Sequence, residues 1–509
     1  MAKTRKKPLF VTFYDVSKAY DNADNADMLK IIWEQGIRGK TWRILKDMND
    51  KLKAKVKTKY GLTDEIDMDV GGRQGSRVTG RMFSKLMDLL SEEAMASDKG
   101  FQMFEDLRIA LLLWVDDVVS LADGKNEQWS VLGCLDQFAK DHKLKWGQEK
   151  CQVMKVGKHD RNENNDWKIG DMPINKTKSY KYLGDIVTDD GKNTKNIENR
   201  HDKTISNTIS IKTIATNDIF RDIGTTVLLQ LHETNTLSAL LTNCESWTLL
   251  KKEKEQFEQI EIQSIKILFD LPSHTPTPAL IYCFGLIYTA LRVEKRQLLY
   301  LWKVLNREQS HWTHKALTHV MTANSGWGKS CIEILTKHDL PTNLQIIKSL
   351  SKNDWTNKVN KAIEKNNKDR LLEDLHKTEI GIRRRKTKTA AIVDSIENLE
   401  YQRQPLSEIM RCSKQETKTI IMARFGMLEC GNNYKGTKSE ICNECNNLDD
   451  ENHRLNYCSK YSNVNFHDQM DKINFQNIYS NDVIVLRQTV DEIRKVWNVH
   501  NANGTMNAE

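Results

Sequence analysis

Two adjacent aspartates, Asp116 and Asp117, interrupt a run from Ala110 to Ala122 that is otherwise apolar apart from Ser120. An apolar run split by a tight acidic pair is typical of a β-hairpin with its charges at the turn. Charge in such surroundings is costly, because the strands desolvate it and the two carboxylates repel each other. A divalent cation would offset both costs, since Mg²⁺ prefers carboxylate oxygens. Taken alone, however, the pair favours a solvated hairpin turn, in which Asp is common.

Composition limits the class of protein. The chain has 509 residues, 39% hydrophobic and 29% charged, which indicates a charge-rich globular protein and excludes a disordered chain. Lys and Arg exceed Asp and Glu by 77 to 69, a mild basic bias that is compatible with polyanion binding. The longest apolar stretch, Ala279–Leu291, is too short to cross a bilayer. An apolar run that ends at Asp15 follows the basic start Lys3–Lys7, so we expect no signal peptide.

Four further motifs accompany the acidic pair. In chain order, the five segments are Phe13–Asp21, Gly71–Ser76, Trp114–Asp117, Lys145–Lys150 and Tyr180–Gly184. The ordered series resembles the palm motifs of reverse transcriptases, specifically those of non-LTR (LINE-type) retrotransposons. The resemblance covers residues 8 to about 200, and it depends on the order of the motifs rather than on any one of them.

The resemblance implies a two-metal site for Mg²⁺ or Mn²⁺ made by Asp15, Asp116 and Asp117. The backbone carbonyl of Val16 is implied as a further ligand. Such ions lower the pKa of a primer 3′-hydroxyl and neutralise charge on nucleotide phosphates. Lys150 is similar to the lysine that the family places near the leaving pyrophosphate, where it donates a proton or stabilises charge. Without its motif, Lys150 would be interpreted as an ordinary surface lysine.

Other residues are implied in substrate binding. Tyr20 stands where the family places an aromatic ring that blocks a ribose 2′-hydroxyl; without the motif it would be interpreted as a core aromatic. The implied nucleotide-binding loop consists of Gly72, Arg73, Gln74 and Gly75, and the implied primer-grip turn of Tyr182, Leu183 and Gly184. Glycines let the backbone approach a nucleotide, and Gln74 offers it an amide. Taken alone, the two segments would be a structural turn and an ordinary hairpin.

The sequence departs from the family pattern in several places. Trp114-Val115 precede the acidic pair, where the family usually has Tyr-Ala, and Gly147 stands where an Asn is usual. The chain begins fourteen residues before Asp15, so the upstream fingers segments of such enzymes are missing. We therefore expect either a fragment of a longer element protein or a truncated copy. No endonuclease motif is readable in the 51 residues after Cys458.

Three of the ten cysteines cluster near the end of the chain with one histidine. Cys442, Cys445, His453 and Cys458 give the spacing C-x2-C-x7-H-x4-C. Four such ligands favour one structural Zn²⁺ over the alternative of free cysteines and a surface histidine. LINE-type proteins commonly end with a similar module, and nearby Cys430 is an alternative ligand. The other cysteines are scattered, which indicates reduced thiols and a nuclear or cytoplasmic protein.

The predicted fold class is α+β: a polymerase palm of antiparallel strands flanked by helices, then a helical thumb, a basic helical connector and a small CCHC zinc module. The expected boundaries are 1–200 for the palm, 201–310 for the thumb, 311–428 for the connector, 429–465 for the zinc module and 466–509 for the tail. Helices are predicted over Val227–Leu241, Phe257–Phe269, Thr289–Leu305 and Asp482–Val496, with a break at Leu271–Pro278. The basic run Arg383–Lys388 is as compatible with phosphate binding or nuclear import as with a solvated face.

The predicted function is RNA-directed DNA synthesis in retrotransposition. The expected partners are an RNA template, a DNA primer or target and deoxynucleoside triphosphates, without a membrane. One alternative is a non-catalytic nucleic-acid-binding remnant that lacks fingers. A third candidate, a palm-type nucleotide cyclase, is disfavoured by the glutamine-glycine loop, the Tyr-Leu-Gly turn and the Cys/His spacing.

Overall fold

The computed structural model divides the chain into two compact units, Met1–Asn196 and Ile197–Glu509. It describes residues 8–49, 52–68, 71, 76–96, 99–104, 107–157, 166–216, 223–381, 407–425, 427–428, 441–443, 445–458, 477–478, 480 and 482–504. The boundary between the units lies within helix α7, Thr194–Thr216. This division falls close to the palm boundary expected near residue 200.

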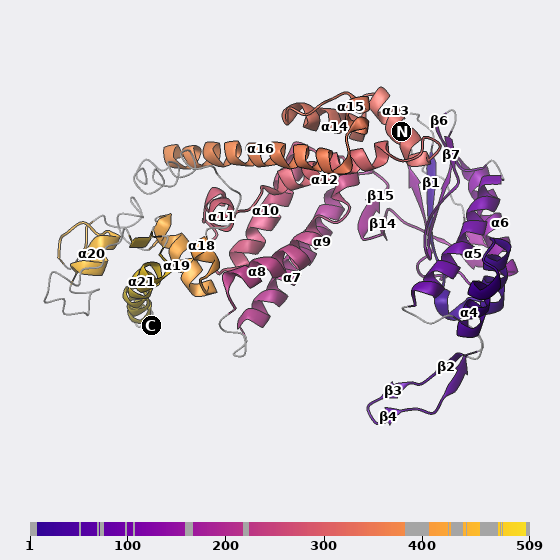
Figure 1. The fold of residues 1–509 in the computed structure, drawn as a ribbon, viewed down its shortest axis with the longest axis horizontal. Coiled ribbons are helices and arrows are strands. Elements are labelled where there is room, and N and C mark those ends of the chain that lie inside the picture. The colour runs from indigo at the N-terminus through magenta and orange to yellow at the C-terminus, as the bar shows by residue number, and fades with distance from the viewer. Residues whose placement is uncertain are drawn as a thin grey trace. The chain divides into compact units, whose positions relative to one another are not determined.

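The first unit mixes short strands with helices (Figure 1). Its elements are β1 (Leu9–Asp15), α2 (Ala19–Asn22), α3 (Asn25–Glu34), α4 (Gly39–Asn49), β2 (Leu52–Ala54), β3 (Lys57–Thr58), β4 (Gly61–Leu62), β5 (Ile66–Met68), α5 (Arg77–Ala96), β6 (Phe101–Phe104), β7 (Leu107–Ile109), β8 (Leu111–Trp114), β9 (Asp117–Ala122), α6 (Lys125–Asp141), β10 (Gln152–Val156), β11 (Lys168–Ile169), β12 (Met172–Pro173), β13 (Asn175–Lys176), β14 (Ser179–Tyr182) and β15 (Asp185–Thr188). The hairpin predicted within Ala110–Ala122 is confirmed, as β8–β9, and the apolar run that ends at Asp15 forms β1.

A five-stranded sheet forms the centre of this unit, in the order β13-β10-β1-β9-β8. β1 lies in the middle and pairs antiparallel with both neighbours, β9 and β10. Because side chains alternate along a strand, β1 sends Phe10 and Tyr14 to one face and Val11 and Phe13 to the other. Both faces of this strand are therefore covered.

Helices α3, α5 and α6 cover the face that carries Tyr14. Apolar residues at helical spacing on α5, among them Met82 and Leu86, pack into the same core as Phe10 and Tyr14. Figure 1 shows α5 and α6 side by side along the sheet. Beneath these helices the buried Tyr14 hydroxyl has a hydrogen-bond partner, since it is 2.9 Å from the Ser120 Oγ.

The second unit is helical (Figure 1). Its elements after α7 are α8 (Thr225–Leu231), a π-helical segment η2 (His232–Leu237), α9 (Ser238–Leu240), a 3₁₀ turn η3 (Cys244–Ser246), α10 (Lys251–Leu268), α11 (Thr277–Phe284), α12 (Thr289–Leu305), α13 (Trp312–Thr322), α14 (Gly326–Lys337), α15 (Leu344–Ser349), α16 (Lys352–Gly381), α18 (Ser407–Met410), α19 (Lys414–Arg424), α20 (Glu451–Asn456) and α21 (Val483–Gly504). The helix predicted at Thr289–Leu305 has those bounds in the structure, as α12.

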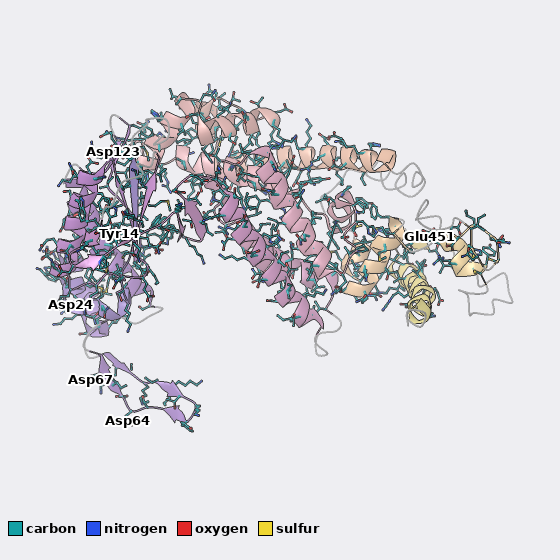
Figure 2. All side chains as sticks on the ribbon, turned by 180° about the vertical axis from the view of Figure 1, so that it is seen from behind. Tyr14, Asp24, Asp64, Asp67, Asp123 and Glu451 are labelled. Carbon is teal, nitrogen blue, oxygen red and sulfur yellow. The ribbon has the colours of Figure 1, made fainter. Side chains whose placement is uncertain are left out.

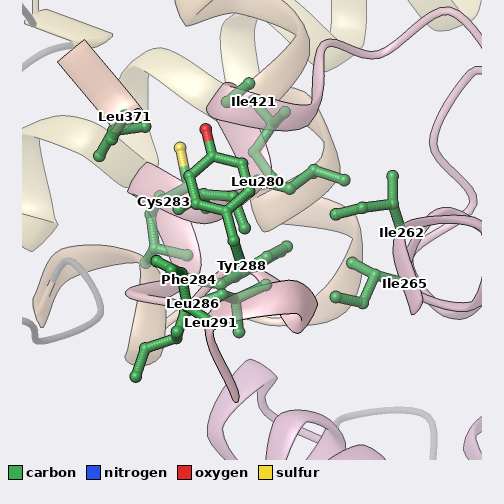
Figure 3. Packing of buried hydrophobic residues seen from close by; sticks show 14 of the residues in the cluster. Ile262, Ile265, Leu280, Cys283, Phe284, Leu286, Tyr288, Leu291, Leu371 and Ile421 are labelled. Atoms are coloured by element: carbon green, nitrogen blue, oxygen red, sulfur yellow. The ribbon is translucent and has the colours of Figure 1, made fainter. Parts of the chain in front are cut away.

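One apolar core joins distant parts of this unit. Figure 3 shows Tyr288 beside Leu280 and Cys283 of α11, with Leu371 of α16 and Ile421 of α19 in the same cluster. The Tyr288 hydroxyl donates to an Asp374 carboxylate oxygen at 2.8 Å, so the ring is buried without an orphaned polar group. Within the described part of the chain, no helix combines the length and apolar character needed to cross a membrane.

The break predicted at Leu271–Pro278 is confirmed over residues 271–276, because α10 ends at Leu268 and α11 begins at Thr277. Helix α11 itself was not predicted. Pro276 occupies the N-cap position of this helix and Pro278 lies in its first turn, where a missing N–H removes no helical hydrogen bond.

Candidate active site and metal centre

The acidic site is built by the pairing of β1 with β9. Asp15, the last residue of β1, lies directly opposite Asp117, the first residue of β9. Directly opposed residues of antiparallel strands project to the same face, with Cβ atoms about 4.5–5.5 Å apart. The register therefore places two carboxylates side by side that are a hundred residues apart in the sequence. They project to the face that carries Phe13, away from helices α5 and α6.

The third carboxylate belongs to the turn between β8 and β9. Trp114 pairs with Asp117, so Val115 and Asp116 form a two-residue turn. Val115 has φ 58°, a left-handed conformation that is strained for a β-branched residue. This turn sets Asp116 next to Asp117 at the end of the hairpin.

The electrostatics reflect the crowding of negative charge. Burial raises the pKa of the Asp117 carboxyl, and the neighbouring Asp116 and Asp15 raise it further. Lys150 opposes this effect, since its Nζ is 3.0 Å from Asp15 Oδ1. The hydrogen bond to Asp15 in turn raises the pKa of Lys150, which favours its cationic form. An oxygen-only donor set with excess negative charge fits Mg²⁺ or Mn²⁺.

The segment that carries Lys150 is anchored to the end of β1. The Ser17 N–H donates to the Lys145 carbonyl at 2.7 Å, and the Gly147 N–H donates to the Asp15 carbonyl at 2.8 Å. A Cβ added at Gly147 would lie 3.1 Å from Asp15 Oδ2. Gly147, which was noted only as a departure from the family pattern, thus allows this close approach. Val16, whose carbonyl is an implied ligand, forms an antiparallel bridge with Trp146 in the same segment.

The implied primer-grip turn connects β14 and β15. Tyr182 pairs with Asp185, and Leu183 and Gly184 between them have φ 46° and 91°. Two positive φ angles in a two-residue loop match the tight turns of β-hairpins, and Gly184 adopts such an angle at no steric cost. The pKa of Tyr182 is raised by burial and by the charge of Asp117. The Tyr182 ring centroid is 5.9 Å from that of Phe13, which lies on the same face of β1 as Asp15.

Tyr180 belongs to this site but was not predicted. Its ring stacks on Phe13 with centroids 4.0 Å apart, and its hydroxyl donates to the Lys150 carbonyl at 3.0 Å. Burial, followed by the charges of Asp15 and Asp117, raises its pKa to about 12. Tyr180 and Tyr182 are two residues apart on one strand and so share a face, a period-two signal that could have revealed the contact.

Some predicted residues cannot be placed. Gly72, Arg73, Gln74 and Gly75 lie outside the described residues, as does the side chain of Tyr20 on α2. Gly71 is described: its N–H donates to the Ala23 carbonyl at 3.0 Å, and its carbonyl accepts from Asn25 Nδ2 at 2.8 Å. Gly71 is thus attached to the corner between α2 and α3.

The second unit carries a sulfur-rich cluster made by Cys442, Cys445, His453 and Cys458. Their possible ligand atoms all lie within 4.8 Å of one another. Cys445 Sγ is 3.2 Å from His453 Nε2, and Cys442 Sγ is 3.7 Å from Cys458 Sγ. Three thiols and one imidazole fit tetrahedral Zn²⁺ with no position left open. Cys430, the alternative ligand, lies outside the described residues.

Local structure assembles this cluster. A bridge between Ile441 and Leu448 closes the turn that carries the first two cysteines, and Asp450 caps α20 by accepting from the His453 N–H at 2.7 Å. Beside it, Arg454 and Asp449 form a buried ion pair with Nε and Oδ1 2.6 Å apart. The donors thus come from a turn and the helix that follows it.

The part of the chain that contains the acidic site is similar to a known protein family. Residues 1–187 match the family described as Reverse transcriptase (RNA-dependent DNA polymerase). This part of the chain is therefore similar to reverse transcriptases. It contains β1, the acidic hairpin, Lys150 and the Tyr182 turn.

Two solved structures are similar to the chain. One is telomerase from Candida tropicalis in complex with a TWJ fragment of telomeric RNA, at 12% identity and TM-score 0.28, covering 69% of this chain and 49% of that chain. The other is telomerase from Candida albicans in the same kind of complex, at 11% identity and TM-score 0.26, covering 62% and 51%. This chain spans about half the length of each.

Proposed function

We propose that the chain is an RNA-directed DNA polymerase that extends a primer 3′-hydroxyl with deoxynucleoside triphosphates on an RNA template. The single observation that carries this proposal is the register of β1 and β9, which sets Asp15 against Asp117 beside the Asp116 turn. The match of residues 1–187 to reverse transcriptases supports the same reaction.

In this proposal, Asp15, Asp116 and Asp117 hold two Mg²⁺ or Mn²⁺ ions, with the Val16 carbonyl as a further ligand. When bound, the ions would lower the pKa of the primer hydroxyl and neutralise charge on the triphosphate. The carboxylates would keep the reacting groups beside the turn of the β8–β9 hairpin.

Lys150 is proposed to act on the leaving group. Its side chain is 67% exposed while that of Asp15 is 19% exposed, so the ammonium reaches out from the carboxylate toward solvent. Like an ordinary lysine it carries a proton at neutral pH, and the hydrogen bond to Asp15 raises its pKa further. It can stabilise negative charge on pyrophosphate and donate that proton.

Substrate positioning is assigned to the neighbouring segments. The Tyr182-Leu183-Gly184 turn would support the primer end, and the stacking of Tyr180 on Phe13 keeps this hairpin against the sheet. Tyr20 would exclude a ribose 2′-hydroxyl, and the loop Gly72–Gly75 would contact the nucleotide.

The non-LTR type is proposed from the order of the motifs together with the Cys/His cluster downstream. That cluster would hold one structural Zn²⁺ through Cys442, Cys445, His453 and Cys458. The proposed setting is an element ribonucleoprotein in the nucleus and cytoplasm, where thiols stay reduced.

A primer-extension assay on an RNA template tests the proposal. Asp116→Ala with Asp117→Ala is expected to lower extension at least about 10³-fold relative to the wild type. Asp141→Asn, which alters an exposed carboxylate on α6, is the matched control and should extend normally. A folded wild-type chain that binds RNA but never extends the primer would instead support the nucleic-acid-binding remnant.

A further inference from the structure

Residues 52–68 form a two-stranded ribbon, here called the arm. β2 pairs with β5 and β3 pairs with β4, both antiparallel. Between these pairs, the Thr63 N–H donates to the Val56 carbonyl at 3.0 Å. The arm extends away from the sheet and helices of its unit in Figure 1, and Asp64 and Asp67 mark it in Figure 2. From Lys55 to Asp67 every residue is exposed.

Apolar and aromatic side chains of the arm face solvent. Tyr60 at the tip is 87% exposed, Leu62 67% and Val56 52%. A two-stranded hairpin without packing is only marginally stable in water, and clustered exposed apolar groups mark interaction sites. The arm therefore has the character of a surface that another molecule covers.

Positive charge is concentrated toward the tip. Lysines alternate along the outgoing strand at positions 53, 55, 57 and 59, so successive ones are about 6.6 Å apart. Near the base, Glu65 pairs with Lys53 at 3.1 Å and with Lys55 at 3.7 Å. Among the described residues, Lys57 and Lys59 pair with no acidic side chain. The Nζ of Lys59 lies 4.8 Å from the centroid of the Tyr60 ring.

The base of the arm leads into the predicted site. After β5 the chain reaches Gly71, which is bonded to Ala23 and Asn25, and then enters the predicted nucleotide-binding loop Gly72–Gly75. The arm is thus continuous with a segment expected to lie at the polymerase centre.

We propose that the tip of the arm binds single-stranded nucleic acid, with Lys57 and Lys59 on phosphates and the Tyr60 ring stacked on an unpaired base. Single-stranded nucleic acid fits this surface, because its phosphates can contact the cations and its unpaired bases can stack on the exposed ring. A second copy of the arm is disfavoured as the partner, because the two positive tips would repel each other. This binding goes beyond the proposed catalysis, since it needs neither the carboxylates nor a nucleotide.

Fluorescence anisotropy of the full chain with a labelled, unstructured 20-nucleotide RNA tests this, without Mg²⁺ or nucleotides and across KCl concentrations. Each phosphate contact adds about 0.7 to the slope of log affinity against log salt. Lys57→Gln with Lys59→Gln should therefore lower the slope by about 1.4 and weaken binding about 25-fold at 0.1 M KCl. The same measurement with a DNA strand of equal sequence shows whether the 2′-hydroxyl contributes.

The arm supplies its own matched controls. Lys53→Gln removes a charge that Glu65 already neutralises, so it should change affinity less than about twofold. Glu65→Gln removes the negative charge beside Lys53 and Lys55, so the arm gains one net positive charge and should bind about fivefold more tightly at 0.1 M KCl. Tyr60→Ala should weaken binding about tenfold at every salt concentration, whereas Tyr60→Phe should not. All variants should keep the wild-type melting temperature, because these side chains are exposed.

Unchanged affinity and slope in Lys57→Gln/Lys59→Gln would overturn the proposal. So would equal competition by a blunt RNA duplex in which no base is unpaired. A concentration-dependent dimer in light scattering that Tyr60→Ala abolishes would show that a second copy covers the tip. Because no catalysis is measured, an inactive polymerase would leave each of these outcomes interpretable.

Discussion

The acidic site and the Cys/His cluster are both candidate metal sites, but they are assembled in opposite ways. Asp15 and Asp117 meet only because β1 pairs with β9 across the centre of a sheet. The donors from Cys442 to Cys458 lie in one short segment, which a single bridge and one helix bring together. The first arrangement depends on the fold of a whole unit, and the second on local structure.

This difference predicts that substitutions at the two sites have different consequences. The carboxylates repel one another, so they do not stabilise the fold that brings them together. Their replacement should therefore cost the fold little stability. The sulfur-rich cluster offers a closed donor set, and binding of Zn²⁺ to such a set contributes directly to folding. Changes at the acidic site should therefore remove activity with the fold intact, whereas changes at the cluster should unfold its surroundings.

The largest expected effect is loss of zinc. Cys442→Ser should reduce zinc from about one equivalent per chain to nearly none, because three remaining donors leave the site open. Elemental analysis measures the metal, and hydrogen exchange should show faster exchange around α20. Cys134→Ser, which changes a free cysteine on α6, should keep the metal. A native chain without zinc would contradict the prediction.

Replacement of Lys150 tests its proposed role in catalysis at the acidic site. Lys150→Met should lower the rate constant of primer extension about 10²-fold, since general acid catalysis and stabilisation of the leaving group are lost together. Single-turnover kinetics measure this step, and thermal melting should change little because the side chain is largely exposed. Lys145→Met, in the same segment, should retain the wild-type rate. Equal losses in both variants would point to a structural role of the segment instead.

A smaller effect is expected at Gly147. Gly147→Ala would place a methyl group 3.1 Å from Asp15 Oδ2, so the carboxylate must shift by a few tenths of an ångström. We expect about a tenfold loss of extension, partly restored by higher Mg²⁺. Gly133→Ala on α6 meets open space and should instead stabilise the fold by about 0.5–1 kcal/mol. Unchanged kinetics in Gly147→Ala would show that Asp15 tolerates displacement.

The smallest effect is a gain in stability. The pKa of Asp117 is raised in the folded chain, so its ionisation opposes folding above that pKa, and this penalty disappears below the unfolded value of 3.8. Asp117→Asn should therefore raise the melting temperature by about 2 °C at pH 7 without divalent cations. The gain should shrink as the pH falls toward the unfolded value. A gain independent of pH would contradict this origin.

Much of the local structure could be read from the sequence. The hairpin around Asp116-Asp117 and helix α12 follow directly from apolar patterning. The Cys/His cluster follows from ligand spacing. Each of these signals lies within one continuous segment, where the period of a strand or helix already decides which side chains share a face.

Other features of the structure could not be predicted from the sequence of any single segment. Helix α11 was not predicted, and its apolar side chains are buried in a core that distant helices share. The π-helical segment His232–Leu237 lies inside a stretch predicted as one helix, and the buried His232 there is 2.7 Å from Ser264 Oγ on α10. Tyr180 joined the acidic site only through its stacking on Phe13.

The amino-acid sequence by itself therefore determined which residues carry chemistry and which short segments present them. Only the tertiary structure decided that Asp15 faces Asp117, that Lys150 reaches Asp15, and that Tyr180 packs beneath them. The physical reason is strand register, since a shift by one residue would turn every side chain of β1 to the other face of the sheet. That register is set by the burial of both faces together, which no single segment encodes.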